Sequence, residues 1–254
     1  MSSYDFRKQP SVLIQGAMDT ETAYLIENLR EREKISLGNW EFHTGFLGKN
    51  SEPVIVSKTY QGMVNAAAAG SLALSFFSPA TVINQGIAGG HDSSFHRGDI
   101  VIGEKAVPMG AWFRRYAPCG AGIREDDFEP LEIEIFDRKI GKTRKVTEFP
   151  CDGKLVSLAE RVETHLCARR GVLGSADEWN NQLDRIALLR RRYHTASEDM
   201  ESAATAELCL SYGVPFIGIR IISNSIVNGE EYDESVGLDG QKFVLKFIEA
   251  LRGH

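Results

Sequence analysis

With 254 residues, the chain can bury one substantial hydrophobic core, so a single domain over residues 1–254 is expected rather than two. Its formal net charge of −6 disfavours a nucleic-acid partner, which would need clustered Lys and Arg; the short basic run Arg190–Arg192 is interpreted as a solvated helix end. No segment approaches roughly twenty consecutive apolar residues, and the N-terminus lacks an apolar run of signal-peptide length. No membrane partner is therefore expected, and the protein is predicted to be cytoplasmic.

Cysteine and histidine spacing gives no sign of a metal or redox site. The four cysteines form no CxxC pair, so reduced thiols are expected. His91 and His96 are five residues apart, which fits no common ligand pattern, and both are interpreted as part of a solvated loop. No metal and no cofactor are expected.

Short apolar runs alternate with amphipathic stretches, a pattern typical of an α/β domain with a central mixed β-sheet flanked by helices. In chain order, the first half predicts a strand that ends at Gly16, a helix over 20–32, strands over 40–47 and 53–60, a helix over 65–77, and strands over 80–90 and 98–107. The second half predicts helices over 154–167, 178–192 and 202–213, a strand over 214–223 that is buried on both faces, and a closing helix over 241–252.

Residues 108–150 break this alternation. They mix Pro, Gly, charged and aromatic residues, and are expected to form the longest excursion from the core. Long loops on a rigid sheet are where binding residues tend to lie.

The stretch from Thr195 to Cys209 is predicted to be a helix-forming run that opens with acids, among them Glu198 and Asp199. Acids suit the positive end of a helix, which would explain them without any function. The alternative is that Met200 and Glu201 face a ligand.

Four predicted strands end in polar or glycine-rich turns: "GAMDTE", "NQGIAGGHD", "SEDMES" and "RIISNS". In open α/β sheets, ligands bind outside the carboxyl ends of the strands, so these turns are the natural site candidates. Gly86, Gly89 and Gly90 fit either turn chemistry or a ligand cradle. Their spacing does not match GxGxxG, which disfavours a dinucleotide.

The order of these turns resembles the purine nucleoside phosphorylase and nucleosidase superfamily, and within it the bacterial 5′-methylthioadenosine/S-adenosylhomocysteine nucleosidases. "GAMDTE" is similar to the family's "GAMEEE", "VINQGIAGG" to "IINTGSAGG", and "GDIVIGEKAV" to "GDIVVSDE". "DMESAATAELC" is similar to "EMEATAIAHVC", and "PFIGIRIISNS" to "PFVVVRAISD". The resemblance covers nearly the whole chain and is weakest over 108–150. It implies a nucleoside phosphorylase-like fold.

The resemblance also implies roles for individual residues. Glu201 corresponds to the glutamate that grips the ribose hydroxyls and favours a cationic sugar ring, and Met200 to the methionine that packs on the ribose. Glu21 corresponds to the general base that activates the attacking water. Trp179 lies where the family places an aromatic residue that stacks on the base; the alternative is a core or interface tryptophan. Arg220 is interpreted as a buried structural partner.

Hydrolysis is favoured over phosphorolysis. Phosphorylase relatives have an Arg shortly after the first strand and a Ser in the "GSxG" turn; here no Arg follows before Arg30, and Ile87 stands at the Ser position beside Gly86. Water is therefore the expected nucleophile, although Arg114 or Arg115 could supply an anion site.

Asn224 stands where adenine-releasing relatives have an Asp that protonates N7 of the leaving base. A carboxamide can donate a hydrogen bond but cannot deliver a proton, and losing general-acid help typically costs about 10²–10⁴-fold. An amide can both donate and accept hydrogen bonds, which suits a 6-oxopurine base, so Asn224 suggests a preference for 6-oxopurines. Two alternatives stay open: Asp177 supplies the proton, or the protein is catalytically weak.

These features together predict a purine nucleosidase that acts on a small-molecule purine nucleoside. The alternatives are a 6-oxopurine nucleoside hydrolase or phosphorylase, and a nucleoside-binding protein with little turnover. The resemblance also implies a homo-oligomer, which is expected to be a dimer.

Overall fold

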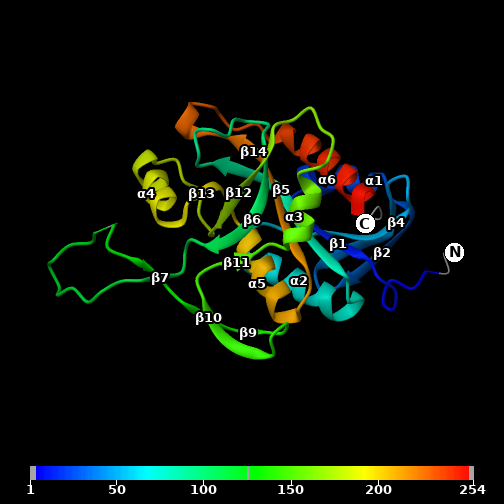
Figure 1. Ribbon diagram of the computed structural model, residues 1–254, viewed down its shortest axis with the longest axis horizontal. Coiled ribbons are helices and arrows are strands. Elements are labelled where there is room, and N and C mark those ends of the chain that lie inside the picture. The colour runs from blue at the N-terminus through cyan, green and yellow to red at the C-terminus, as the bar shows by residue number, and fades with distance from the viewer. Residues whose placement is uncertain (1–3, 125, 252–254) are drawn as a thin grey trace.

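A computed structural model describes residues 4–124 and 126–251, so the final residue of the predicted closing helix, Arg252, lies outside the described residues (Figure 1). The main sheet joins its strands in the order β11-β6-β12-β13-β5-β1-β4-β3-β2, and β14 pairs with both β5 and β6. The bounds of these strands are β1 Val12–Gly16, β2 Arg30–Leu37, β3 Trp40–Leu47, β4 Glu52–Lys58, β5 Thr81–Gly90, β6 Ile100–Pro108, β11 Phe149–Pro150, β12 Ala168–Ser175, β13 Thr195–Asp199 and β14 Phe216–Asn224.

The sheet is mixed and partly closes on itself. β1 is parallel to both β4 and β5, whereas β2, β3 and β4 form an antiparallel meander. β14 pairs with β5 in parallel and with β6 in antiparallel orientation. Because it joins these two strands, β5, β13, β12, β6 and β14 form a closed ring. Closure leaves these strands no free edge and holds β13 and β14 on either side of β5.

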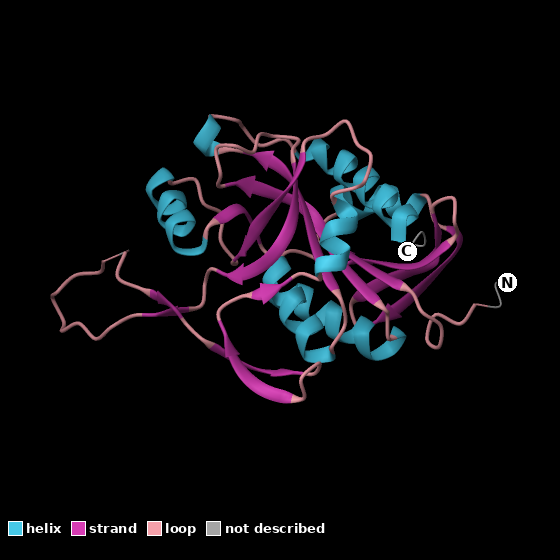
Figure 2. Cartoon of the chain, viewed as in Figure 1, coloured by secondary structure: helices cyan, strands magenta, loops and turns pink. Residues whose placement is uncertain are grey.

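Helices cover both faces of the sheet (Figures 1 and 2). α1 packs with α6 on one face, and α2 packs with α5 on the other. α3 contacts β6 and α6. The helix bounds are α1 Asp19–Glu27, α2 Met63–Phe77, α3 Gly153–Ala159, α4 Leu183–Tyr193, α5 Ser202–Tyr212 and α6 Gly237–Leu251, with short 3₁₀ helices η1 Ile226–Asn228 and η2 Glu234–Val236.

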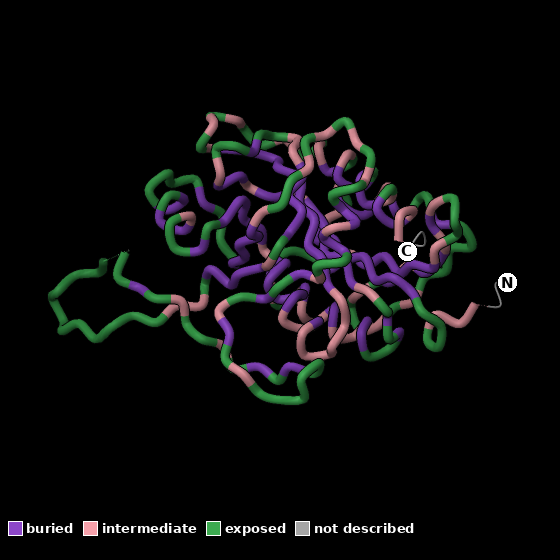
Figure 3. Tube along the Cα trace, viewed as in Figure 1, coloured by how far each residue is buried: buried purple, intermediate pink, exposed green. Residues whose placement is uncertain are grey.

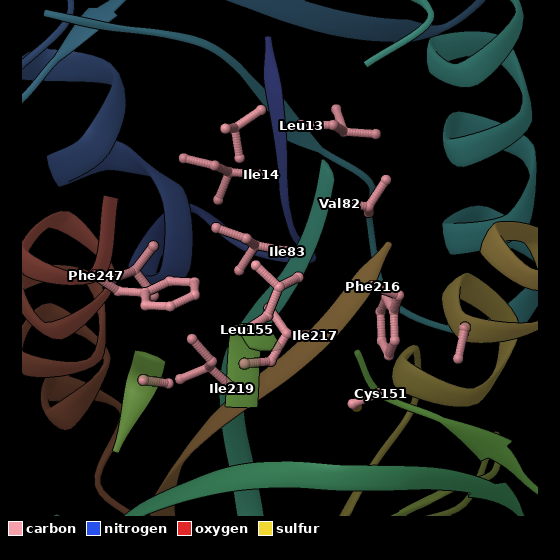
Figure 4. Close-up of a cluster of buried hydrophobic side chains, with 14 of the residues drawn as sticks. Leu13, Ile14, Val82, Ile83, Cys151, Leu155, Phe216, Ile217, Ile219 and Phe247 are labelled. Carbon is pink, nitrogen blue, oxygen red and sulfur yellow. The ribbon is translucent and has the colours of Figure 1, made fainter. Parts of the chain in front are cut away.

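The core lies between these layers, which is why the central strands are continuous apolar runs rather than alternating ones. Figure 4 shows Leu13 and Val82 on one side of the strand layer and Ile14 and Ile83 on the other. All four side chains are buried. Burial is concentrated along the central strands and the inner faces of the helices (Figure 3).

Between β6 and β11 the chain leaves the main sheet. The part around β7 Trp112–Phe113 projects as an arm at the left of Figure 1, and the part with β9 Ile133–Asp137 and β10 Lys142–Val146 lies near α5. β7 pairs with β8 Glu129–Pro130 at the base of the arm, and β9 forms a hairpin with β10. β11 then returns the chain to β6.

Three predicted helices are shorter than expected. The first ends at Glu27, because the charged segment that follows pairs with β3 as the edge strand β2. The helix predicted over 154–167 ends at Ala159, because the Cys167 carbonyl already accepts from the Ile100 amide and leads into β12. The helix predicted over 178–192 begins only at Leu183.

The prediction that Glu198 and Asp199 open a helix is wrong. Both lie in β13, and α5 begins only at Ser202, after Glu201 in the N-cap position. Pairing of β13 with β12 and β5 outweighs the local helical preference. Among the described residues, no helix is both long and apolar enough to cross a membrane.

Candidate active site

The four predicted turns meet in one pocket at the carboxyl ends of β1, β5, β13 and β14. The residues that line it are Ala17, Met18, Glu21, Gln61, Ile87, Ala88, Gly89, Glu178, Trp179, Glu198, Asp199, Met200, Glu201, Ser223, Asn224 and Tyr232. Of the seven predicted site residues, the structure therefore brings six to this pocket, all except Gly86.

Glu21 is held at the pocket by the start of α1. β1 ends at Gly16, and the buried Glu21 side chain turns back so that its Oε2 accepts from the Met18 amide at 3.0 Å and from the Ala17 amide. Its Oε1 accepts from the Ile87 amide at 2.9 Å. Burial raises the pKa of Glu21, although nearby Arg220 and these backbone donors oppose the shift. The carboxyl group is thus held in one position, and its pKa lies above the ordinary value for Glu.

Gly86 makes room for Glu21 rather than lining the pocket, which differs from its predicted substrate-binding role. A Cβ atom on Gly86 would lie 2.4 Å from Glu21 Oε1 and 3.1 Å from Arg220 Nη1. Any side chain here would therefore push on a carboxyl that three backbone donors hold in place.

Replacing Gly86 with alanine is expected to destabilise the fold by about 1–3 kcal/mol, because the added methyl overpacks this site. Urea unfolding of the variant measures the change in the free energy of unfolding. Gly153→Ala is the matched control, because a Cβ there meets open space. Equal stability of the two variants would contradict the packing argument.

Glu201 is the second acid in the pocket. Its Oε1 accepts from the Gly62 amide at 2.9 Å, and its Oε2 lies 3.7 Å from Arg220 Nη2. Burial raises the pKa of Glu201 to about 7; Arg220 opposes this, and the neighbouring acids Asp199 and Glu21 reinforce it. Glu21 and Glu201 therefore share one pocket, and their carboxyl groups repel each other electrostatically.

Asp199 and Arg220 form a buried ion pair next to these acids. Both side chains are buried, and Arg220 Nε lies 3.1 Å from Asp199 Oδ2. Asp199 Oδ1 accepts from Ser175 Oγ at 2.8 Å, from the Glu201 amide at 2.9 Å and from the Ser202 amide at 2.8 Å. Although burial opposes it, the pKa of Asp199 lies below its usual value because of Arg220 and these donors. Arg220 also donates to Asn84 Oδ1. It is the structural partner that the sequence suggested.

The other end of the pocket carries aromatic and amide groups. Trp179 and Tyr232 meet edge-to-face with ring centroids 5.3 Å apart, and both side chains remain partly exposed at the mouth. Asn224, at the end of β14, accepts a hydrogen bond on Oδ1 from Ser223 Oγ at 2.9 Å. Such a mouth can take a flat ring between aromatic side chains and an amide.

Asp177 is not placed to supply a proton beside Asn224. Its Oδ1 accepts from the Met63 amide at 2.8 Å at the start of α2, and it does not line the pocket. Glu198 is the acid near Asn224. Its position in the site was not predicted, because it was interpreted as a helix-opening residue. The only β-branched residue of β13 is Thr195, so the local sequence carries little sign of a strand there.

The prediction of a solvated loop is wrong for His91. This side chain is buried, its Nδ1 is 2.8 Å from Thr195 Oγ1, and its Nε2 is 3.1 Å from Glu198 Oε2. His96 is exposed and lies against Glu230. Within the part of the chain that the structure describes, no group of three or more His, Cys, Asp or Glu side chains could hold a metal ion.

The arm does not bring its arginines to the pocket. Arg114 donates to the Arg124 carbonyl at 2.8 Å and lies over the Trp112 ring, while Arg115 pairs with Glu129 at 2.8 Å. Neither arginine lines the pocket, so they do not supply an anion site there.

Comparison with known proteins identifies the family. A sequence profile described as the phosphorylase superfamily matches residues 11–252. The chain belongs to the phosphorylase superfamily. Among curated proteins, it is 29% identical over 248 residues to the 5′-methylthioadenosine/S-adenosylhomocysteine nucleosidase of Bacillus pumilus, covering 94% of this chain and 98% of that one. It is 28% identical over 251 residues to the nucleosidase of the same name from Bacillus cereus, covering 95% and 99%.

Solved structures of other proteins share this fold. The Colwellia psychrerythraea 5′-methylthioadenosine/S-adenosylhomocysteine nucleosidase, in complex with adenine, has a TM-score of 0.74 at 25% identity and covers 96% of each chain. Futalosine hydrolase of Helicobacter pylori has a TM-score of 0.76 at 23% identity, covering 95% of this chain and 98% of that one. The predicted family and α/β fold are confirmed. The curated relatives named above are nucleosidases.

Proposed function

We propose that this protein hydrolyses the N-glycosidic bond of a purine nucleoside. The observation that carries the proposal is the meeting of Glu21 and Glu201 in one buried pocket, with Arg220 behind both. The sequence relatives named above are nucleosidases, which supports the same reaction class.

Glu201 is proposed to bind the ribose 2′- and 3′-hydroxyls. A carboxylate accepts hydrogen bonds from two adjacent hydroxyls, and its negative charge favours the cationic sugar ring that forms as the bond to the base breaks. Met200 lines the pocket beside it and offers an apolar surface to the ribose. Arg220 stays 3.7 Å away and keeps the carboxylate compatible with burial.

Glu21 is proposed to act as the general base. A carboxylate has about four lone-pair positions, and three of them accept from the backbone amides of Ala17, Met18 and Ile87. The remaining position is available to take a proton from an attacking water. Its raised pKa brings the base closer to the operating pH, where general-base catalysis is most effective.

Water suits this pocket better than phosphate as the nucleophile. Five of the described residues that line the pocket are acidic, and none of the lining residues is Lys or Arg; the acids are Glu21, Glu178, Glu198, Asp199 and Glu201. A phosphate dianion beside these acids would meet like charges without a cation at the surface. The proposed reaction is therefore hydrolysis.

A base-release assay tests the reaction. Methylthioadenosine, adenosylhomocysteine, inosine and guanosine are each incubated with the protein, with and without phosphate, and the free base is measured. Release without phosphate supports hydrolysis, and release that requires phosphate contradicts it. Thermal stabilisation by nucleosides without any release would instead indicate a nucleoside-binding protein, because a ligand stabilises the folded state whether or not it reacts.

The raised pKa of Glu201 predicts that activity is lost as the pH falls. Both acids must be ionised to act as proposed, so kcat/KM is expected to decline as the pH drops below about 7, where Glu201 takes up a proton. Glu21, whose pKa is also raised, acts in the same direction. Initial rates across pH measure the decline. In Glu201→Gln the remaining activity should fall less steeply; an unchanged slope would contradict the assignment.

A further inference from the structure

Three buried polar side chains form a hydrogen-bonded chain that ends at Arg220. Asn84 Oδ1 accepts from Arg220 Nη2, and Asn84 Nδ2 donates to Thr205 Oγ1 at 3.0 Å. Thr205 Oγ1 in turn donates to Gln15 Oε1 at 3.1 Å. All three side chains are buried, and none of them lines the pocket. The direction of these bonds fixes the Asn84 amide with its oxygen toward Arg220.

The chain connects the elements that carry the two acids of the pocket. Gln15 is in β1, the strand that precedes α1, and Thr205 is in α5, where its amide donates to the Glu201 carbonyl at 3.1 Å. Asn84 lies between them on β5, which pairs with both β1 and β14. The position of Arg220 on β14 is therefore tied to the elements on both sides of it.

Arg220 lies close to Glu201 without a direct hydrogen bond. Its Nη2 is 3.7 Å from Glu201 Oε2, whereas a bond between a guanidinium and a carboxylate usually measures about 2.7–2.9 Å. The same Nη2 donates to Asn84 instead, and Nε lies 3.1 Å from Asp199 Oδ2. Glu201 Oε2 thus keeps its lone pairs for a ligand in the pocket.

Resting on the proposed function, we propose that Asn84 is a positioning residue, which keeps the Arg220 guanidinium at a distance from Glu201 and so leaves Glu201 Oε2 free for the ribose hydroxyls. A buried N–H group that loses its acceptor is costly to leave unpaired. Without the Asn84 oxygen, Arg220 Nη2 would turn to Glu201 Oε2, and the direct ion pair would occupy the atom that binds the sugar. Because Asn84 is neutral, it holds the guanidinium without adding a negative charge beside these acids.

Four charged side chains meet around this position. Arg220 comes from β14 and faces Asp199 from β13, Glu201 from the N-cap of α5 and Glu21 from α1. Burial raises the pKa of Glu201, Arg220 opposes this, and Asp199 and Glu21 reinforce it. A guanidinium that moves closer should therefore lower the pKa of Glu201, and one that is drawn away should raise it.

Two substitutions at position 84 are expected to shift the pH profile of kcat/KM in opposite directions. Asn84→Leu lets Arg220 bond to Glu201, so the acidic midpoint should move down by about 1 pH unit while the nucleoside dissociation constant rises about 10-fold. Asn84→Asp offers Arg220 a charged acceptor and adds a negative charge, so the midpoint should move up by about 1 pH unit. Initial rates across pH and calorimetric titration with nucleoside measure the two effects.

Asn228→Leu is the matched control. It removes an amide that donates to the Phe95 carbonyl at 2.9 Å and does not line the pocket, so the pH profile and the affinity should match those of the wild type. If Asn84→Leu does not fold, Thr205→Val removes only the hydroxyl that orients Asn84. It should shift the midpoint and the affinity in the same directions by smaller amounts. An unchanged midpoint, or shifts of the same sign in Asn84→Leu and Asn84→Asp, would overturn the positioning role.

The base-release assay decides the proposed function separately. If the wild type releases no base, the pH dependence of nucleoside affinity replaces the rates, because the ionised Glu201 carboxylate binds the ribose hydroxyls in either case. Opposite shifts of that dependence in the two Asn84 variants would reject the hydrolase and keep this inference. Equal dependence in both variants and the wild type would reject the inference.

Discussion

Replacing Glu21 with glutamine is expected to lower the rate of base release by about 10²–10⁴-fold while nucleoside affinity stays close to that of the wild type. Glutamine keeps the size of the side chain but cannot accept the proton of the attacking water. Its amide must also face one of the backbone donors that now bind the carboxylate, so some loss of stability is expected. Single-turnover rates and nucleoside dissociation constants measure the two effects.

Glu201→Gln is the comparison that separates the base from the sugar clamp. It removes the charge from the residue proposed to hold the ribose hydroxyls, so both affinity and rate should decrease. The melting temperature of each variant shows whether the fold is intact. Wild-type turnover in the Glu21 variant would contradict its role as the general base. Unchanged nucleoside affinity in the Glu201 variant would contradict its role in binding the ribose hydroxyls.

Replacing Arg220 with methionine is expected to lower the free energy of unfolding by about 3–5 kcal/mol. Arg220 is fully buried, and its guanidinium is the cation beside Asp199 at 3.1 Å and Glu201 at 3.7 Å. Without it, these buried carboxyls lose their compensating charge, and Glu21 loses a neighbour that opposes its pKa shift. Chemical denaturation of the protein without ligand measures the change.

Arg170→Met provides the control, because the exposed Arg170 pairs with Glu160 at 2.6 Å on the surface, where ion pairs contribute about 0–1 kcal/mol. If Arg220→Met does not fold, Arg220→Lys retains a positive charge and should recover part of the stability. A loss in the Arg220 variants no larger than in the control would show that the buried cluster is not held by this charge.

The central layers could be predicted from the sequence because their signals are local. Apolar runs such as those of β1, β5 and β14 indicate strands covered on both faces. Glu21 follows β1, and Asn224 is the last residue of β14. Ligands gather at the carboxyl ends of such strands, so the turns were expected to meet.

The strands that were missed or misjudged have no such signal. β2 is rich in charged residues and exposed, and it is a strand because β3 offers it an edge to pair with. β13 carries Glu198 and Asp199, and its pairing with β12 and β5 overrides the helical preference of its sequence. In both, a partner far away in the chain decides the conformation.

The sequence by itself determined the family, the layered fold and the acids at the strand ends, because side-chain periodicity and turn chemistry depend on neighbouring residues. Only the tertiary structure decided which charge lies beside which. Arg220 meets Asp199 and Glu201, and Glu198 faces Asn224 across Gly89, because strands from distant parts of the chain pair in one register. Burial then shifts the pKa values of these carboxyls, and burial is a property of the packed layers rather than of any local stretch.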